Sequence, residues 1–100
     1  MIEAMISEME SAFCKGVFSR KTTFRFRLED ATIVITVDGD GYLVEKGDAA
    51  AADCDCATSA EIFRKIWYEG YRPGIMDFIS GAIVCDNPLM LPQFLRAFGR

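Results

Sequence analysis

Apolar side chains recur with two different periods in the first third of the chain. Over residues 2–14 they fall at helical spacing, and glutamates occupy many of the remaining positions. This pattern predicts an amphipathic helix that ends near Gly16. From Thr22 to Leu28, phenylalanine and leucine alternate with threonine and arginine, which predicts a strand with one buried and one exposed face.

Three further segments between residues 31 and 57 have strand patterns. The segment from Ala31 to Val37 is rich in β-branched residues, and the segment from Tyr42 to Lys46 follows an Asp-Gly-Asp-Gly turn. Residues 51–57 alternate again, with cysteines toward one face and aspartates toward the other. Because the connections are short, we expect an antiparallel meander of three or four strands.

The second half of the chain predicts helices around one more strand. Thr58, with Glu61 three residues later, matches a capping box, so a helix is expected to begin there and to end at Gly70. The remaining elements are a short helix opened by Pro73 and closed by Gly81, a strand from Ala82 to Cys85, and a final helix from Leu89 to Phe98 with Pro92 in its first turn.

The expected order of elements is α-β-β-β-β-α-α-β-α. We therefore predict an α+β fold in which a five-stranded, mostly antiparallel sheet is covered on one face by helices. At 100 residues the chain fits a single domain, 1–100, with an N-terminal helix over 2–14 and a body over 22–98.

Composition narrows the classes of function. The chain has 51% hydrophobic residues, and its 11 basic and 15 acidic residues give a net charge of −4. An acidic chain without a basic run argues against nucleic-acid binding. The lack of histidine removes the usual general base and most metal sites. Since no nucleophile, base and oxyanion site come together, we expect no enzyme activity, no catalytic residue, no cofactor and no metal.

The first ten residues are acidic and lack a basic flank, which argues against a signal peptide. The apolar stretches are far shorter than the ~20 residues that cross a bilayer. We therefore expect a cytoplasmic protein without stable membrane insertion. In that compartment Cys14, Cys54, Cys56 and Cys85 are expected to be reduced thiols.

The cysteines at 54 and 56 share one face of the fourth predicted strand. If Cys85 lies on the neighbouring strand and also points inward, three sulfur atoms could meet. Small buried apolar residues are the favoured interpretation, because Cys-x-Cys is not the usual zinc spacing. A cross-strand disulfide, and a metal or reactive-thiol role, stay open as alternatives.

The opposite face of the same strand carries Asp53 and Asp55. Arg25 and Arg27 are predicted to lie on that polar face and to pair with these carboxylates weakly, as surface ion pairs do. We interpret the group as a solvated sheet face, because acid–base chemistry with paired carboxylates requires a cleft.

Aromatic rings dominate the predicted interface between sheet and helices. A filled core is the simpler interpretation, and the alternative is that the rings frame a cavity for an apolar ligand. Periodicity cannot separate the two, because a ring that fills a cavity and a ring that lines one have the same spacing. The final helix lies at a terminus of this chain, where local opening costs least, and could act as a lid.

From Thr22 to Phe98 the chain resembles the sterol carrier protein family. The resemblance is carried, in order, by the strand residues Ala52-Asp53-Cys54 before a capped helix, the link Gly70-Tyr71-Arg72-Pro73, the segment Phe78-Ile79-Ser80-Gly81 before the last strand, and the closing apolar helix from Leu89 to Phe98. It implies a five-stranded sheet covered by helices and an apolar tunnel that binds fatty acyl chains, acyl-CoAs, phospholipids or sterols without catalysis.

Our first hypothesis is therefore a non-catalytic carrier whose partner is an apolar small molecule, a lipid. The candidate ligand-binding residues are Phe24, Phe26, Ile33, Ile35, Phe63, Trp67, Ile75, Phe78, Ile79, Phe94, Leu95 and Phe98. The alternative is an interaction or accessory module with a filled core, which docks or forms a homodimer through the N-terminal helix. The void between sheet and helices should discriminate the two, since small-molecule pockets run from ~300 Å³ upward.

Overall fold

The computed structural model describes residues 2–29, 31–47 and 51–100. Its five strands are β1 (Thr22–Arg27), β2 (Thr32–Val37), β3 (Tyr42–Lys46), β4 (Cys54–Thr58) and β5 (Ile83–Cys85). They form one sheet in the order β3-β2-β1-β4-β5. The helices are α1 (Ile2–Ala12), α2 (Ala60–Tyr68), α3 (Ile75–Ile79), the short 3₁₀ helix η1 (Pro88–Met90) and α4 (Leu91–Ala97).

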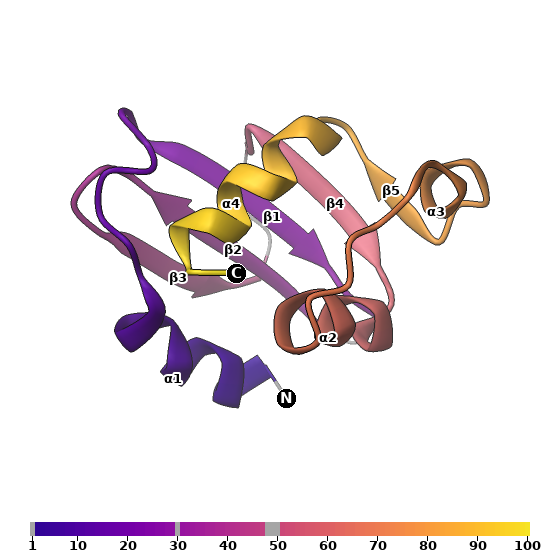
Figure 1. Ribbon diagram of the computed structural model, residues 1–100, viewed down its shortest axis with the longest axis horizontal. Helices are drawn as coiled ribbons and strands as arrows, with labels where there is room; N and C mark the ends of the chain where they lie inside the picture. The colour runs from indigo at the N-terminus through magenta and orange to yellow at the C-terminus, as the bar shows by residue number, and fades with distance from the viewer. Residues whose placement is uncertain (1, 30, 48–50) are drawn as a thin grey trace.

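The predicted α+β class and the order of elements are confirmed. Figure 1 shows α4 lying across the sheet, α2 near one end of the strands, and α3 beyond the edge strand β5. None of the helices in the described part of the chain is both long and apolar enough to span a membrane.

The fourth strand does not continue the meander. Strands β1, β2 and β3 pair antiparallel, but β4 returns to pair with β1 in parallel, with Phe24 opposite Cys54 and Phe26 opposite Cys56. The strand begins at Cys54 rather than at residue 51. Because β4 is parallel to β1, a hairpin turn cannot connect it to the meander.

The N-cap of α2 lies one residue after the predicted cap, Thr58. Ser59 is the N-cap, and its hydroxyl accepts the backbone N–H of Ile62 at 3.1 Å. Thr58 is instead the last residue of β4, and its hydroxyl donates to the carbonyl of Ala82 at 2.9 Å. The prediction that Gly70 ends this helix is confirmed by its left-handed φ of 70°. Pro92 lies in the first turn of α4, as expected.

The core lies between the sheet and helices α1, α2 and α4. The ring of Phe94 on α4 is 4.9 Å from that of Phe24 and 5.0 Å from that of Phe26, measured between centroids. Phe63 on α2 lies 5.0 Å from Phe26 on its other side. Rings from the two layers therefore pack directly against one another over the centre of the sheet.

Replacement of Phe94 tests how much this contact stabilises the fold. The Phe94 side chain is 1% exposed, so we expect Phe94→Ala to lower the free energy of unfolding by about 3–5 kcal/mol in urea denaturation. Leu89→Ala is the control: its side chain is 88% exposed, so we expect a change within about 0.5 kcal/mol. Similar losses in both variants would contradict a core centred on Phe94.

Candidate functional site

An apolar pocket opens between the sheet and the helices, at the end of the core where β5, α2 and α4 meet. Its volume is about 30 Å³, and its exposed lining is entirely apolar. The lining residues are Phe26, Cys56, Thr58, Phe63, Ile66, Pro73, Ile83, Leu91, Phe94 and Leu95. The Thr58 hydroxyl donates its proton to the carbonyl of Ala82, so it offers no hydrogen-bond donor to the pocket. The exposed wall of the pocket is therefore hydrocarbon-like.

The structure distributes the candidate ligand-binding residues over three environments. Nine of them are buried in the core: Phe24, Phe26, Ile33, Ile35, Phe63, Trp67, Phe94, Leu95 and Phe98. Four of these nine, Phe26, Phe63, Phe94 and Leu95, also line the pocket. Phe78 is partly buried against the core, whereas Ile75 and Ile79 are exposed.

The pocket also has lining residues that sequence reasoning did not nominate. Cys56 and Ile83 come from neighbouring strands, Pro73 from the link before α3, and Leu91 from the first turn of α4. The signal for Leu91 was its apolar character beside Pro92. The role of Cys56 and Ile83 depends on how β5 pairs with β4, which the sequence does not specify.

This pocket is small in the described structure. A volume of about 30 Å³ is roughly a tenth of the ~300 Å³ at which small-molecule pockets begin. Tilted rings in close contact occupy part of the region where a tunnel was expected. A hydrocarbon chain could enter only if the helices or β5 moved away from the sheet.

Helix α3 contributes no fully buried residue, and three of its four apolar side chains are exposed to solvent. Ile75, Met76 and Ile79 are 74%, 67% and 68% exposed. The helix follows Pro73, which lines the pocket. An exposed apolar surface therefore lies next to the pocket wall.

Local polar contacts hold α3 in shape. The Asp77 carboxylate accepts the backbone N–H of Gly74 at 2.8 Å and the hydroxyl of Tyr71 at 2.6 Å. The Tyr71 hydroxyl, followed by the Gly74 amide, lowers the pKa of Asp77. The same contact raises the pKa of Tyr71. These hydrogen-bond partners all lie between Tyr71 and Asp77. A movement of residues 71–77 as one segment would therefore keep these hydrogen bonds.

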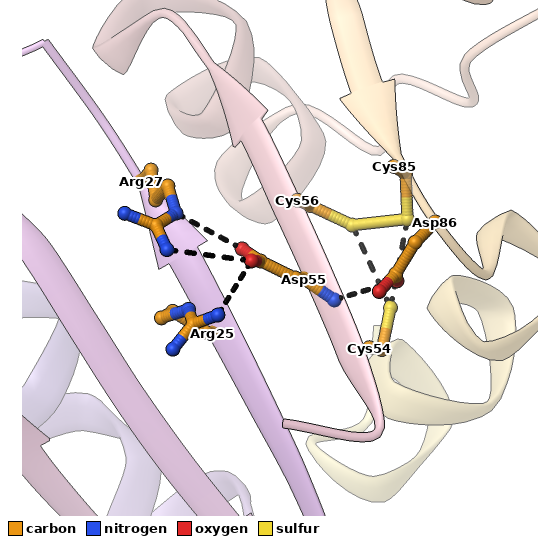
Figure 2. Close-up of polar contacts among 7 residues, drawn as sticks. All are labelled: Arg25, Arg27, Cys54, Asp55, Cys56, Cys85 and Asp86. Atoms are coloured by element: carbon orange, nitrogen blue, oxygen red, sulfur yellow. Dashed lines mark hydrogen bonds and ion pairs between the residues drawn. A yellow bond between two sulfur atoms is a disulfide. The ribbon is translucent and has the colours of Figure 1, made fainter. Parts of the chain in front are cut away.

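Three cysteine sulfurs converge beside the pocket (Figure 2). Cys56 and Cys85 form a disulfide across β4 and β5, where the two residues are direct register partners. The Cys54 sulfur lies 3.6 Å from that of Cys56 and 3.5 Å from that of Cys85. The expectation that all four cysteines are reduced is therefore wrong for this pair, because the register of β5 places the two side chains face to face.

Cys54 is a buried thiol that is protected from ionisation. It donates to the backbone carbonyl of Asn87 at 3.4 Å. Burial, with Asp86 and Asp55 nearby, raises its pKa to about 12. If the disulfide were reduced, Cys54, Cys56 and Cys85 would offer three soft ligands, with all ligand atoms within 4.8 Å of one another. A metal would have to displace the proton of this buried thiol, which disfavours that use.

The other side of β4 carries an ion-pair cluster, which Figure 2 also shows. The Asp55 carboxylate accepts Arg25 Nη2 at 2.6 Å and Arg27 Nε at 3.2 Å. The hydrogen bond from Arg25 is the main cause of a lowered Asp55 pKa. The predicted pairing on the polar sheet face is thus confirmed for Asp55, whereas the Asp53 carboxylate accepts the backbone N–H of Thr23 at 2.9 Å.

Searches against protein-family models and against curated proteins found no match for this chain. Solved structures do match in shape. The double mutant of the sec-alkyl sulfatase PisA1 is similar with a TM-score of 0.79 and 12% identity over 100% of this chain and 16% of that one. The sec-alkylsulfatase Pisa1 from Pseudomonas sp. is similar with a TM-score of 0.70 and 15% identity, over 84% of this chain and 14% of that one. The chain therefore spans about a sixth or less of these enzymes.

Two further structures are similar over most of their own length. The ubiquinone synthesis protein UbiJ-SCP2 gives a TM-score of 0.58 and 13% identity over 94% of this chain and 73% of that one. Sterol carrier protein 2 like 2 from Aedes aegypti is similar with a TM-score of 0.54 and 13% identity, over 94% of each chain. The chain therefore has a sterol carrier protein-like fold, as the sequence motifs implied. At these identities the likeness establishes the fold alone.

Thiol labelling should report the cysteine states. Cys14 is exposed and Cys54 is buried, so a maleimide at pH 8 should add one label to the native, unreduced protein, at Cys14. Unfolding without reductant should expose Cys54 and give two labels. Unfolding with reductant should give four, since the disulfide then contributes two thiols. Mass spectrometry reads the count, and four labels without reductant would contradict the disulfide.

The ion-pair cluster predicts a pH-dependent contribution to stability. Because the Asp55 pKa is lowered in the folded state, the pair stabilises the protein above the ordinary Asp value of ~3.9 and loses this effect as pH falls through and below it. We expect Asp55→Asn to cost about 1 kcal/mol at pH 7 and progressively less toward pH 3. Asp40→Asn, at an exposed turn position, is the control. A pH-independent difference between Asp55→Asn and the unchanged protein would contradict this account.

Proposed function

We propose that this domain binds the hydrocarbon part of an apolar molecule between its sheet and helices, without catalysing a reaction. The observation that carries the proposal is the pocket lined by Phe26, Phe63, Phe94 and Leu95, whose exposed lining is wholly apolar. No charged side chain lines it, so acid–base chemistry on a bound molecule has no support there.

Binding requires the pocket to widen. We infer that the segment from Gly70 to Ala82 moves outward with the first turn of α4, since α3 buries no residue and holds its own local contacts. The inner rings at Phe24, Trp67 and Phe98 would then come into contact with the ligand. Each CH₂ removed from water contributes roughly 0.8 kcal/mol, so a long acyl chain can offset the cost of separating the layers.

The exposed face of α3 supports an entrance on this side. Ile75, Met76 and Ile79 form an apolar surface next to Pro73, which lines the pocket. A hydrocarbon leaving a membrane or a micelle would meet this surface first. In this arrangement Ile75 and Ile79 guide the ligand in, and Phe78 lies beneath them against the core.

The names of the similar structures agree with a hydrocarbon ligand. They refer to a sterol carrier protein, to ubiquinone synthesis and to a sulfatase of alkyl compounds. Each name includes a compound with a large apolar part. This agreement supports the class of ligand and leaves its identity open.

The alternative, docking through the N-terminal helix, is less well supported. Met5 and Met9 on α1 have exposed fractions of 0%, because this helix turns its apolar face onto the core of its own chain. A partner or a second copy would find mainly the polar side of α1. The geometry therefore favours the pocket over α1 as the place of binding.

A pair of tryptophan substitutions tests the proposal. Leu91→Trp places a large ring at the pocket wall and should weaken binding of a fluorescent fatty acid at least tenfold, which is about 1.4 kcal/mol. Leu43→Trp, at an exposed position on β3, should leave binding unchanged. Circular dichroism and thermal unfolding of both variants check that each is folded.

Lipid extracted from the natively purified protein, identified by mass spectrometry, provides an independent readout. We expect a co-purified molecule with a long hydrocarbon chain. Absence of such a molecule, together with no binding of the fluorescent fatty acid at micromolar protein, would overturn the proposal. Equal fatty-acid binding by Leu91→Trp and the unchanged protein would show that the binding site lies elsewhere.

A further inference from the structure

We propose that the Cys56–Cys85 disulfide is a reversible redox latch on the apolar pocket, closed when oxidised and open when reduced. The part that concerns the ligand rests on the proposed hydrocarbon binding. The part that concerns movement of β5 stands on the geometry of the disulfide alone.

The disulfide is built into the pocket wall. Cys56 lines the pocket, and so does Ile83, which lies two residues before Cys85 on β5. The cross-link between Cys56 and Cys85 therefore fixes the strand that carries Ile83 against the strand that carries Cys56. Any widening of the pocket on this side must move one strand relative to the other.

Besides the disulfide, strand β5 is attached by a short ladder and by the buried side chain of Ile83. It has three residues, and within the described part of the chain it pairs with β4, with Ala57 opposite Val84 and Thr58 opposite Ile83. Hydrogen bonds flank the ladder at both ends: Thr58 donates to Ala82, and Asp55 donates its backbone N–H to the Asp86 carboxylate at 2.8 Å. A short ladder at a sheet edge opens locally more easily than the core strands. The disulfide is thus the strongest link that holds β5.

The cross-link also encloses the segment that would have to move. Its two ends are 29 residues apart in sequence, and between them lie α2, Pro73 and α3. A disulfide restricts the excursions of the loop it closes. Reduction removes this restriction from the end of the segment that is attached to β5.

Reduction also crowds the sulfur cluster. Two thiols at van der Waals contact need more separation than a bonded pair, as the 3.5 Å from the Cys54 sulfur to the Cys85 sulfur illustrates. Cys54 already occupies the space beside both sulfurs. Because β5 is the short edge strand of the sheet, we expect the added separation to move β5 away from β4.

A small reductant can reach the bond from the sheet edge. Cys85 is the partly exposed member of the pair, and it borders an open surface depression with Val84 and Asp86. A dithiol attacks one sulfur of the bond, the other leaves as a thiolate and takes up a proton, and the second thiol of the reductant completes its own ring disulfide. Two electrons and two protons pass to the protein, which gains two thiols.

Cys54 does not take the place of the reductant. Its thiol is held by the Asn87 carbonyl, and burial with nearby carboxylates keeps its pKa at about 12. Since the thiolate is the attacking species in disulfide exchange, the Cys54 thiol does not attack the disulfide. Its sulfur limits the space available to the sulfurs of Cys56 and Cys85.

The experiment compares the oxidised and the dithiothreitol-reduced protein by hydrogen-exchange mass spectrometry and by titration with the fluorescent fatty acid. We expect amides of residues 70–85 to exchange about tenfold faster after reduction, and the fatty acid to bind more tightly or more rapidly. Cys85→Ala removes the latch without changing a residue that lines the pocket. This variant should behave as the reduced protein in both assays, whether or not dithiothreitol is added.

Two control variants keep the disulfide. Cys14→Ser changes the exposed thiol, and Cys54→Ala removes the third sulfur. Both should retain the response to dithiothreitol. Equal exchange over residues 70–85 in both redox states would overturn the latch, and so would four free thiols after treatment with a mild oxidant such as diamide.

The outcomes separate the latch from the carrier. Fatty-acid binding that is equal in both redox states, with equal exchange, would reject the latch and leave the carrier in place. Faster exchange after reduction, without fatty-acid binding in either state, would support the latch on β5 and reject the carrier.

Discussion

The contact between Phe94 and the two phenylalanines of β1 is the constraint on which the rest of this molecule depends. It joins the C-terminal helix to the centre of the sheet, at centroid distances of 4.9 and 5.0 Å. The same rings occupy the space that a ligand would need. In the proposed carrier, stability and binding would therefore compete for one interface, because space opened for a ligand separates rings that pack against one another. This competition explains why the pocket lies at the end of the core, near β5 and Pro73, rather than at its centre.

Much of the fold could be predicted from periodicity, because strands and helices bury one face each. The alternation over Thr22–Leu28 predicted the bounds of β1 to within one residue. The position of Pro92 predicted that the first turn of α4 lies there. The parallel pairing of β4 could not be predicted, since pairing partners depend on the path of the whole chain and leave no local signal. Ser59 was missed as the cap because Thr58, one residue earlier, also matched the capping pattern.

The candidate site was harder to predict than the fold, for a physical reason. Spacing shows which way a ring such as Phe63 points, but the volume left among rings depends on rotamers and on the distance between layers. Strand parity likewise placed Cys54 and Cys56 on one face. Whether Cys85 would stand opposite Cys56 depended on the register of a three-residue strand, and a shift of one residue would have turned Cys85 to the other face. The disulfide is therefore a consequence of register that no local pattern encodes.

The comparisons indicate where specificity in this fold can arise. Structures at 12–13% identity share the arrangement of sheet and helices, so the layer packing accepts many different apolar side chains of suitable total volume. In the proposed carrier, the positions that decide how far the layers can separate would set which hydrocarbons fit, and in this chain those are the wall residues Cys56, Ile83 and Leu91. Cys56 and Ile83 belong to the β5 edge of the core, and the disulfide joins this edge covalently to β4. In the proposed latch, control of access would therefore act at the edge of the core, whereas the packing of Phe94 on β1 holds its centre together.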